Sequence, residues 1–264
     1  MFKTYLVYYL CLHLVGDFYL QSESLADKKC KKVSSLVQHI LIYWITFTLL
    51  SFFVFTKDLM ISIQCICAAH GLIDLIKFCY LRRKKEKLTP SHCRNIYIID
   101  QISHITIFIV SAYILTIETT VLTFNPHIVR FFAIANLEPI LVLSWITMIL
   151  AILKPANITI KQLLTIYRPD SSISLHIMNL PKNTQMIDND AVDTNAGAFI
   201  GSLERLVILI FLSLGQYSAI GLILTAKSIA RYNRITTDRA FAEYYLLGTL
   251  LSMLYVLILY NFVM

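Results

Sequence analysis

The sequence has few charged residues for its length. Asp, Glu, Lys and Arg make up only 15% of the 264 residues, and hydrophobic residues make up 57%. Water-soluble domains contain roughly 25% charged and roughly 45–50% apolar residues. A chain of this length has no interior that can hide the surplus apolar surface. The composition therefore excludes an ordinary soluble domain and indicates a protein that faces lipid.

Sequence motifs typical of several other classes of protein are also missing. The sequence contains no glycine-rich phosphate-binding loop, no P-loop and no nucleophile elbow. Its six cysteines lack the paired spacing of metal-binding loops, and four of them lie within apolar runs. This argues against a secreted disulfide framework. No internal repeat of the kind found in inverted-repeat transporters is evident.

Long apolar runs are the main feature of the chain. Runs of about 20 residues, which can cross a bilayer, lie at about 4–22, 35–56, 59–80, 95–118, 130–153 and 242–262. Another run, 203–226, is interrupted by Gly215, Gln216 and Tyr217. We therefore expect an all-α, multi-pass transmembrane helical bundle, with six crossings plus a re-entrant hairpin or with seven crossings.

Lysine and arginine are concentrated in two of the loops between these runs. The formal net charge is +7, and the loops at 23–34 and 81–94 are strongly basic. Cytoplasmic loops of membrane proteins carry such an excess, so both loops are predicted to be cytoplasmic and the loop at 119–129 to lie outside. The basic charge is then no sign of nucleic-acid binding. A single crossing at 203–226 would break this charge rule, whereas a hairpin would keep it.

The same pattern divides the chain into three parts. Residues 1–153 are expected to form a five-helix transmembrane block with a polar centre. Residues 154–200, the only long polar segment, are expected to be a cytoplasmic insertion that can dock a cytosolic protein. Residues 201–264 are expected to form a C-terminal membrane block, made of an interrupted helix or hairpin plus a last helix.

Histidine and aspartate recur four residues apart within the first block. The pairs are His13 and Asp17, His70 and Asp74, and Asp100 and His104. Residues at this spacing share one face of a helix. The order is reversed in the third pair, which lies on a helix that runs in the opposite direction. Three imidazoles are therefore expected at one depth, and three carboxylates at a depth nearer the cytoplasm.

Ionisable residues within membrane spans are costly and usually functional. Neutral imidazole and carboxylate groups suit zinc, and also manganese or iron, so the expected cofactor is a divalent metal. The candidate metal ligands are His13, His70, His104, Asp17, Asp74 and Asp100, and the three aspartates are also the candidate catalytic residues. Supporting polar residues are Gln21, His39, Gln101, Glu204 and Gln216. The same groups equally suit a proton or ion relay, or a network that only fixes helix packing.

Three basic residues are candidates for binding a negatively charged substrate or headgroup. Lys77 lies on the face of His70 and Asp74, while Lys227 and Arg231 are four residues apart near the predicted cytoplasmic interface. Together with the metal ligands, they predict a site for an anionic amphiphile.

Two blocks of the sequence resemble one known family. They are HLVGDFYLQ, HGLIDLIK and IIDQISH in the first block, and GSLERLVIL, GQYSAIGLILTAKSIARY and FAEYYLLGTLLS in the second. Both blocks are similar to the bacterial integral-membrane family known as domain of unknown function 3307. The resemblance implies a multi-pass protein of the bacterial inner membrane and implies no established reaction. The His/Asp helices are also loosely similar to bacterial membrane-bound metal-dependent hydrolases.

The leading functional prediction is an intramembrane metal-dependent hydrolase that acts on an anionic amphiphilic or lipid-linked substrate. A proton- or cation-coupled transporter or channel is the first alternative. A non-catalytic membrane partner of a cytosolic regulator, docking through 154–200, is the second.

Overall fold

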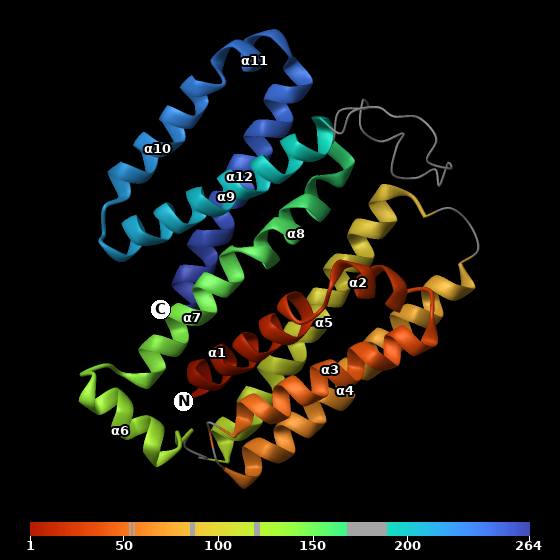
Figure 1. Cartoon of the computed structure of the whole chain (residues 1–264), viewed down its shortest axis with the longest axis vertical. Coiled ribbons are helices and arrows are strands. Elements are labelled where there is room, and N and C mark those ends of the chain that lie inside the picture. Colours follow the sequence, from red (N-terminus) through yellow and green to blue (C-terminus); the bar gives the residue numbers. More distant parts are fainter. Residues whose placement is uncertain (53, 55, 85–87, 119–121, 168–188) are drawn as a thin grey trace. The chain divides into compact units, whose positions relative to one another are not determined.

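The computed structural model describes residues 1–52, 54, 56–84, 88–118, 122–167 and 189–264 (Figure 1). The regular secondary structure of the described residues is entirely helical, with turns and loops between the helices and one isolated bridge between Val54 and Phe124. They fall into two compact units, which meet in sequence at Lys154 and Pro155. The all-α fold expected from the sequence is confirmed for these residues.

The first unit begins with α1 (Phe2–His13), which continues into a π-helical segment, η1 (Leu14–Tyr19). The remaining elements are α2 (Glu23–Lys29), α3 (Val33–Ser51), α4 (Lys57–Arg83), α5 (Pro90–Ile117), α6 (Pro126–Ile134) and α7 (Pro139–Ile152). Capping side chains set the N-terminal ends of some of these helices. The Ser22 side chain accepts a hydrogen bond from the Leu25 N–H, and the Thr89 side chain accepts one from the His92 N–H.

The second unit contains α8 (Lys154–Leu163), a short 3₁₀ segment η2 (Leu164–Tyr167), α9 (Asn189–Ser213), α10 (Tyr217–Ala230), α11 (Tyr232–Thr237) and α12 (Arg239–Val263). The buried guanidinium of Arg205 on α9 donates hydrogen bonds to Asn157 on α8 and Ser252 on α12. These bonds join three helices of the unit. Helices α9 and α10 pack against each other (Figure 1).

Four helices of the described chain are long and apolar enough to cross a membrane: α3, α4, α5 and α12. The pair α6 and α7, bent by 89°, makes a fifth if it is counted as one span. Several long apolar helices are what a membrane protein requires. The number is nevertheless smaller than the six crossings plus a hairpin, or seven crossings, expected from the sequence.

The difference arises where three apolar runs are not single α-helices. The run at 4–22 changes from α to π at Leu14, and the run at 130–153 is divided between α6 and α7. The run at 203–226 breaks at Gly215, whose φ of +68° is readily adopted only by glycine. Apolar composition extends across these breaks, so hydropathy alone could not reveal them.

Five helices of the first unit pack around one core. Helix α1 packs against α3, α5 and α7, while α4 packs against both α3 and α5 (Figure 1). The core includes Tyr5, Tyr9, Phe47, Ile63 and Phe108. These side chains occupy one end of the bundle, and the polar residues described below follow them along the same helices.

Candidate functional site

The His/Asp pairs predicted from the sequence lie inside the first unit. His13, His70, Asp74, Asp100 and His104 are buried, and Asp17 is partly buried. They project from α1 and η1, α4 and α5. The His39 side chain joins them from α3 and is fully buried. Four segments distant in sequence therefore supply one polar cluster.

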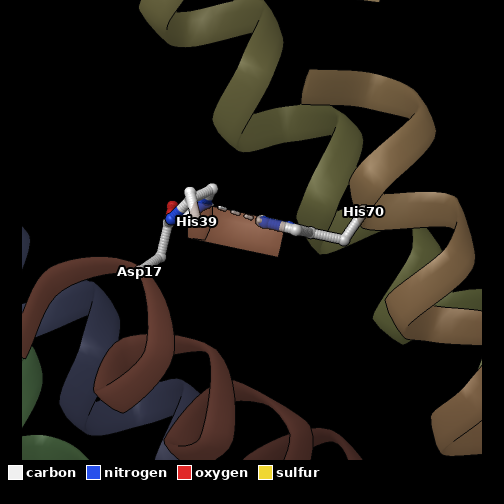
Figure 2. Close-up of side chains that lie close together, drawn as sticks. All are labelled: Asp17, His39 and His70. Carbon is white, nitrogen blue, oxygen red and sulfur yellow. Dashed lines mark hydrogen bonds and ion pairs between the residues drawn. The ribbon is translucent and has the colours of Figure 1, made fainter. Parts of the chain in front are cut away.

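Asp17, His39 and His70 form the first of two groups with a metal-binding arrangement. The His39 Nε2 atom lies 3.2 Å from Asp17 Oδ1 and 3.3 Å from His70 Nε2. Figure 2 shows the three side chains converging from separate elements. One carboxylate and two imidazoles are a ligand set that suits zinc, manganese or iron.

Asp74, Asp100 and His104 form the second group. Within each group, one potential ligand atom from every residue lies within 4.8 Å of the others. The groups are connected, because His39 Nε2 lies 3.1 Å from Asp74 Oδ2 and His70 Nδ1 lies 3.2 Å from His104 Nδ1. We refer to these six residues, Asp17, His39, His70, Asp74, Asp100 and His104, as the His/Asp centre.

His13 lies beside the His/Asp centre and belongs to neither group. Its Nδ1 atom is 3.2 Å from the Tyr43 hydroxyl, and its Nε2 atom is 3.9 Å from Asp17 Oδ2. Its ring centroid is 5.3 Å from that of His104 and 6.0 Å from that of His70. The structure thus brings the three predicted histidines together, but it places His39, predicted only as a supporting residue, in the ligand position.

Tyr43 and Gly16 fix the position of the His70 ring. The Tyr43 ring stacks on His70 with centroids 3.6 Å apart and an interplanar angle of 1°. A Cβ atom at Gly16 would lie 2.9 Å from the Tyr43 ring. Glycine at position 16 therefore allows η1 to approach α3 closely enough for Asp17 to reach His39.

The most unexpected member of the site is Lys29, the last residue of α2. Its ammonium lies 3.3 Å from Asp74 Oδ2 and 3.5 Å from Asp17 Oδ1, and it donates to Gln21 Oε1 at 3.2 Å. Burial by itself would lower the pKa of Lys29, but the neighbouring carboxylates outweigh burial and raise the pKa above its usual value. The ammonium is therefore charged at neutral pH.

From the sequence alone, Lys29 is one of several lysines in a basic loop. One signal of its burial is present: Leu25 and Lys29 are four residues apart and share the buried face of α2. The lysine next to it, Lys28, is exposed. Which of the loop lysines points inward depends on where α2 begins and ends. A helix of only seven residues is too short for its apolar pattern to identify it reliably.

A second lysine anchors the other end of the centre. Lys77 donates to Asp100 Oδ2 at 2.8 Å, and Gln101 donates to the same oxygen at 3.4 Å. The Lys77 side chain is 20% exposed and that of Asp100 is 6% exposed. Lys77 thus lies at the rim of the His/Asp centre and retains access to solvent or ligand.

A small cavity adjoins these lysines. It is lined by Lys29, Cys30, Leu36, Asp74, Lys77 and Phe78, and its volume of about 10 Å³ has room for about one water molecule. Burial raises the pKa of the neighbouring Cys30 thiol. A substrate larger than water can reach the centre by this route only if the surrounding side chains or α2 move.

Two atoms of the centre are spaced for binding a metal ion and not for a hydrogen bond to each other. His104 Nε2 and Asp100 Oδ1 are buried and have no hydrogen-bond partner within the described part of the chain, yet they lie 3.8 Å apart. Two ligands each about 2.1 Å from one zinc ion are roughly 3.4 Å apart at tetrahedral geometry. Buried polar atoms are normally hydrogen-bonded. The pair therefore has the chemistry and approximate spacing of two metal ligands.

The predicted anion-binding residues of the second unit have mostly local partners. Lys227 forms an ion pair with Glu204 at 2.6 Å, and the charged groups of Lys227 and Arg231 lie 5.1 Å and 6.0 Å from the Tyr245 ring centroid. Gln216 is exposed in the turn between α9 and α10. The ion pair and the cation–π contacts hold α9, α10 and α12 together.

Fold and site together define an all-helical protein with several apolar helices of membrane-spanning length and a buried His/Asp centre. A family model described as Protein of unknown function (DUF3307) matches residues 5–132. This segment is thus a domain of unknown function 3307, which bears out the resemblance noted in the sequence, and it contains the complete His/Asp centre. The resemblance of the second sequence block lies beyond the matched residues. No curated protein and no solved structure matches the chain.

Proposed function

We propose that the first unit is an intramembrane metal-dependent hydrolase that acts on an anionic amphiphilic substrate. The observation that carries this proposal is the convergence of three aspartates and three histidines from four helical segments into two adjoining ligand groups. Side chains that only fix helix packing do not need several unpaired imidazole and carboxylate atoms at ligand spacing.

In this proposal, the residues of the centre divide between ligands and supports. Asp17, His39 and His70 hold one ion, while Asp74, Asp100 and His104 offer a second group or share the same ion. A bound divalent ion supplies a Lewis acid and lowers the pKa of coordinated water. Zinc is the first candidate, with manganese or iron as alternatives.

Supporting contacts orient these ligands. Tyr43 holds the plane of His70 by stacking, and Lys77 with Gln101 holds one oxygen of Asp100. The other oxygen of Asp100 remains directed toward His104, in position to bind a metal ion together with that imidazole. Residues of this kind around a metal site tune both affinity and activity.

Lys77 is the proposed contact for the negative charge of the substrate. It is the basic group of the centre with substantial exposure. An amphiphile can place its apolar chain along the exposed apolar sides of the helices while its anionic head reaches Lys77. Lys227 and Arg231 in the second unit are proposed contacts for an anionic headgroup.

The proposed setting is the inner membrane of a bacterium, with the basic loops at 23–34 and 81–94 in the cytoplasm. Within this setting, we propose that the run at 4–22 is an additional crossing. The C-terminal part of α9, together with α10, is proposed to form a re-entrant hairpin. The break at Gly215 supports the hairpin, because it separates the stretches 204–214 and 218–228, and each of these is too short to span a bilayer of about 30 Å by itself.

One observation favours a second candidate, a proton-coupled transporter. The rings of His39, His70 and His104 follow one another with nitrogen–nitrogen distances of 3.3 Å and 3.2 Å. Such a row of imidazoles can pass a proton. The third class, a membrane partner of a cytosolic regulator docking at 154–200, stays a prediction, since 168–188 lie outside the described residues.

The test uses purified full-length protein in detergent micelles and a long-chain alkyl phosphate as the probe. We expect release of inorganic phosphate that stops with a chelator and returns with Zn²⁺ or Mn²⁺. Asp100→Asn should abolish release, whereas the exposed Asp27→Asn should leave it unchanged. Proton flux in liposomes, with neither phosphate release from this probe nor hydrolysis of a long-chain carboxylic ester, would favour the transporter instead.

A further inference from the structure

The ammonium of Lys29 lies among the residues of the His/Asp centre. Its ammonium lies 3.1 Å from His39 Nε2, 3.3 Å from Asp74 Oδ2 and 3.5 Å from Asp17 Oδ1. These atoms include the same side-chain groups that offer metal ligands. A positively charged group of the chain thus already occupies the place where a cation would be held.

An ion and this ammonium cannot share that place. An ion held at about 2.0–2.2 Å by Asp17 and His39, two ligands of the first group, would lie close to the Lys29 Nζ atom, and both the ion and the ammonium carry positive charge. Lysine has three donors and no lone pair when charged, so it cannot become a ligand without losing its proton. The two cations are therefore alternatives.

The charge of the centre favours exchange over addition. With neutral imidazoles, the carboxylates of Asp17, Asp74 and Asp100 and the ammonium groups of Lys29 and Lys77 leave one net negative charge. Replacing Lys29 by one divalent ion makes the centre neutral. Adding the ion beside both lysines would leave one net positive charge, which is costly in a buried site.

Lys29 also has a structural route out of the centre. It is the last residue of a seven-residue helix, and its four-carbon stem is flexible. The small cavity lined by Lys29, Cys30, Leu36 and Lys77 adjoins it. Rotation about the bonds of the Lys29 side chain can therefore move the ammonium away from the carboxylates.

We propose that Lys29 is a tethered counter-ion that a divalent cation displaces from the His/Asp centre. This inference rests on the proposed metal function and adds its regulation. Exchange for a monovalent ion would gain no charge, so Lys29 selects divalent over monovalent cations. It also couples occupancy of the centre to the position of α2, because the ammonium leaves when the ion enters.

The first measurement is Zn²⁺ and Mn²⁺ affinity of the full-length protein in nanodiscs. Lys29→Met keeps most of the apolar stem and removes the competing charge, so we expect divalent ions to bind about tenfold more tightly or better. Lys28→Met, an exposed neighbour on the same helix, is the matched control and should bind as the original protein does.

The second measurement needs no change at Lys29 and therefore does not depend on the folding of that variant. The exposed Cys65, Cys79 and Cys93 are replaced by serine, and alkylation of the partly buried Cys30 is followed with and without Zn²⁺ or Mn²⁺. Displacement of Lys29 should increase the Cys30 alkylation rate several-fold when the ion is present.

The outcomes separate the inference from the proposed function. Stoichiometric metal binding with equal or weaker affinity in Lys29→Met, and with an unchanged Cys30 rate, would overturn the exchange and leave the metal centre standing. Absence of binding in both the original protein and Lys29→Met would overturn the metal centre and the exchange together.

Discussion

The rings of Tyr43 and His70 lie parallel, with centroids 3.6 Å apart, although the residues come from different helices. Tyr43 is 1% exposed, and its hydroxyl is 3.2 Å from His13 Nδ1. Tyr43 thus contacts both His70, which belongs to the His/Asp centre, and His13, which lies beside it. A change at Tyr43 on α3 should therefore affect both His13 on α1 and the candidate ligand His70 on α4.

Two substitutions separate the stacking of Tyr43 from its hydroxyl. Tyr43→Phe keeps the ring and should retain metal binding, with a modest loss of stability from the missing hydroxyl contact. Tyr43→Ala removes a buried ring and should lower stability by about 3 kcal/mol or more, together with metal affinity. Thermal unfolding and metal binding in the same detergent measure both. Equal behaviour of the two variants would refute the stacking role.

Gly16→Ala tests the close approach of η1 to α3. The added Cβ would lie 2.9 Å from the Tyr43 ring, so the ring or η1 must shift. Overpacking of this kind costs about 1–3 kcal/mol, and the shift should also weaken metal binding through His70. Gly221→Ala, where nothing lies within 4 Å, is the control and should leave binding unchanged. Unchanged metal affinity in Gly16→Ala would show that the approach is not needed.

The thiol of Cys30 provides a pH-dependent report on the entrance to the centre. Burial raises its pKa above the ordinary value of 9.0. Because the thiolate is the reactive form, alkylation in metal-free protein should be slow at pH 7 and should keep increasing above pH 9. The rate is measured in a protein in which the exposed Cys65, Cys79 and Cys93 are replaced by serine. A plateau reached below pH 9 would contradict the buried environment.

Thiol labelling also tests the predicted orientation of the protein in the membrane. The thiols of Cys30 and Cys93 lie in the two basic loops, so a membrane-impermeant maleimide should label both from the cytoplasmic side. A cysteine introduced at the exposed Thr123, in a loop predicted to lie outside, should be labelled from the opposite side. Labelling of Cys30 and Cys93 from different sides would overturn the predicted topology.

The sequence predicted much of the centre because helical spacing carries across the chain. The pairs around Asp74 and Asp100 lie on long regular helices, so their shared faces and reversed order follow from residue spacing alone. His39 and Lys29 gain their roles from packing. His39 is a lone histidine in an apolar run, and Lys29 turns inward only because α2 is a short helix with Leu25 on its buried face. Tertiary contacts of this kind leave little trace in local periodicity.

The number of spans shows the same limit for the fold. Hydropathy measures the apolar length of a segment and is insensitive to its backbone geometry. The π-helical change at Leu14, the left-handed Gly215 and the 89° bend between α6 and α7 all occur within runs that are apolar on average. The sequence therefore predicted helices and an interruption near Gly215, and it overestimated how many helices are long and unbroken.

The most direct test of the metal centre is elemental analysis of full-length protein purified without chelators. We predict at least one Zn, Mn or Fe ion per chain, retained by His92→Ala, which alters an exposed histidine outside the centre. His104→Ala and Asp74→Asn should each lose most of the metal while remaining folded. Metal-free protein that is folded and as thermally stable as protein incubated with these ions would contradict the account.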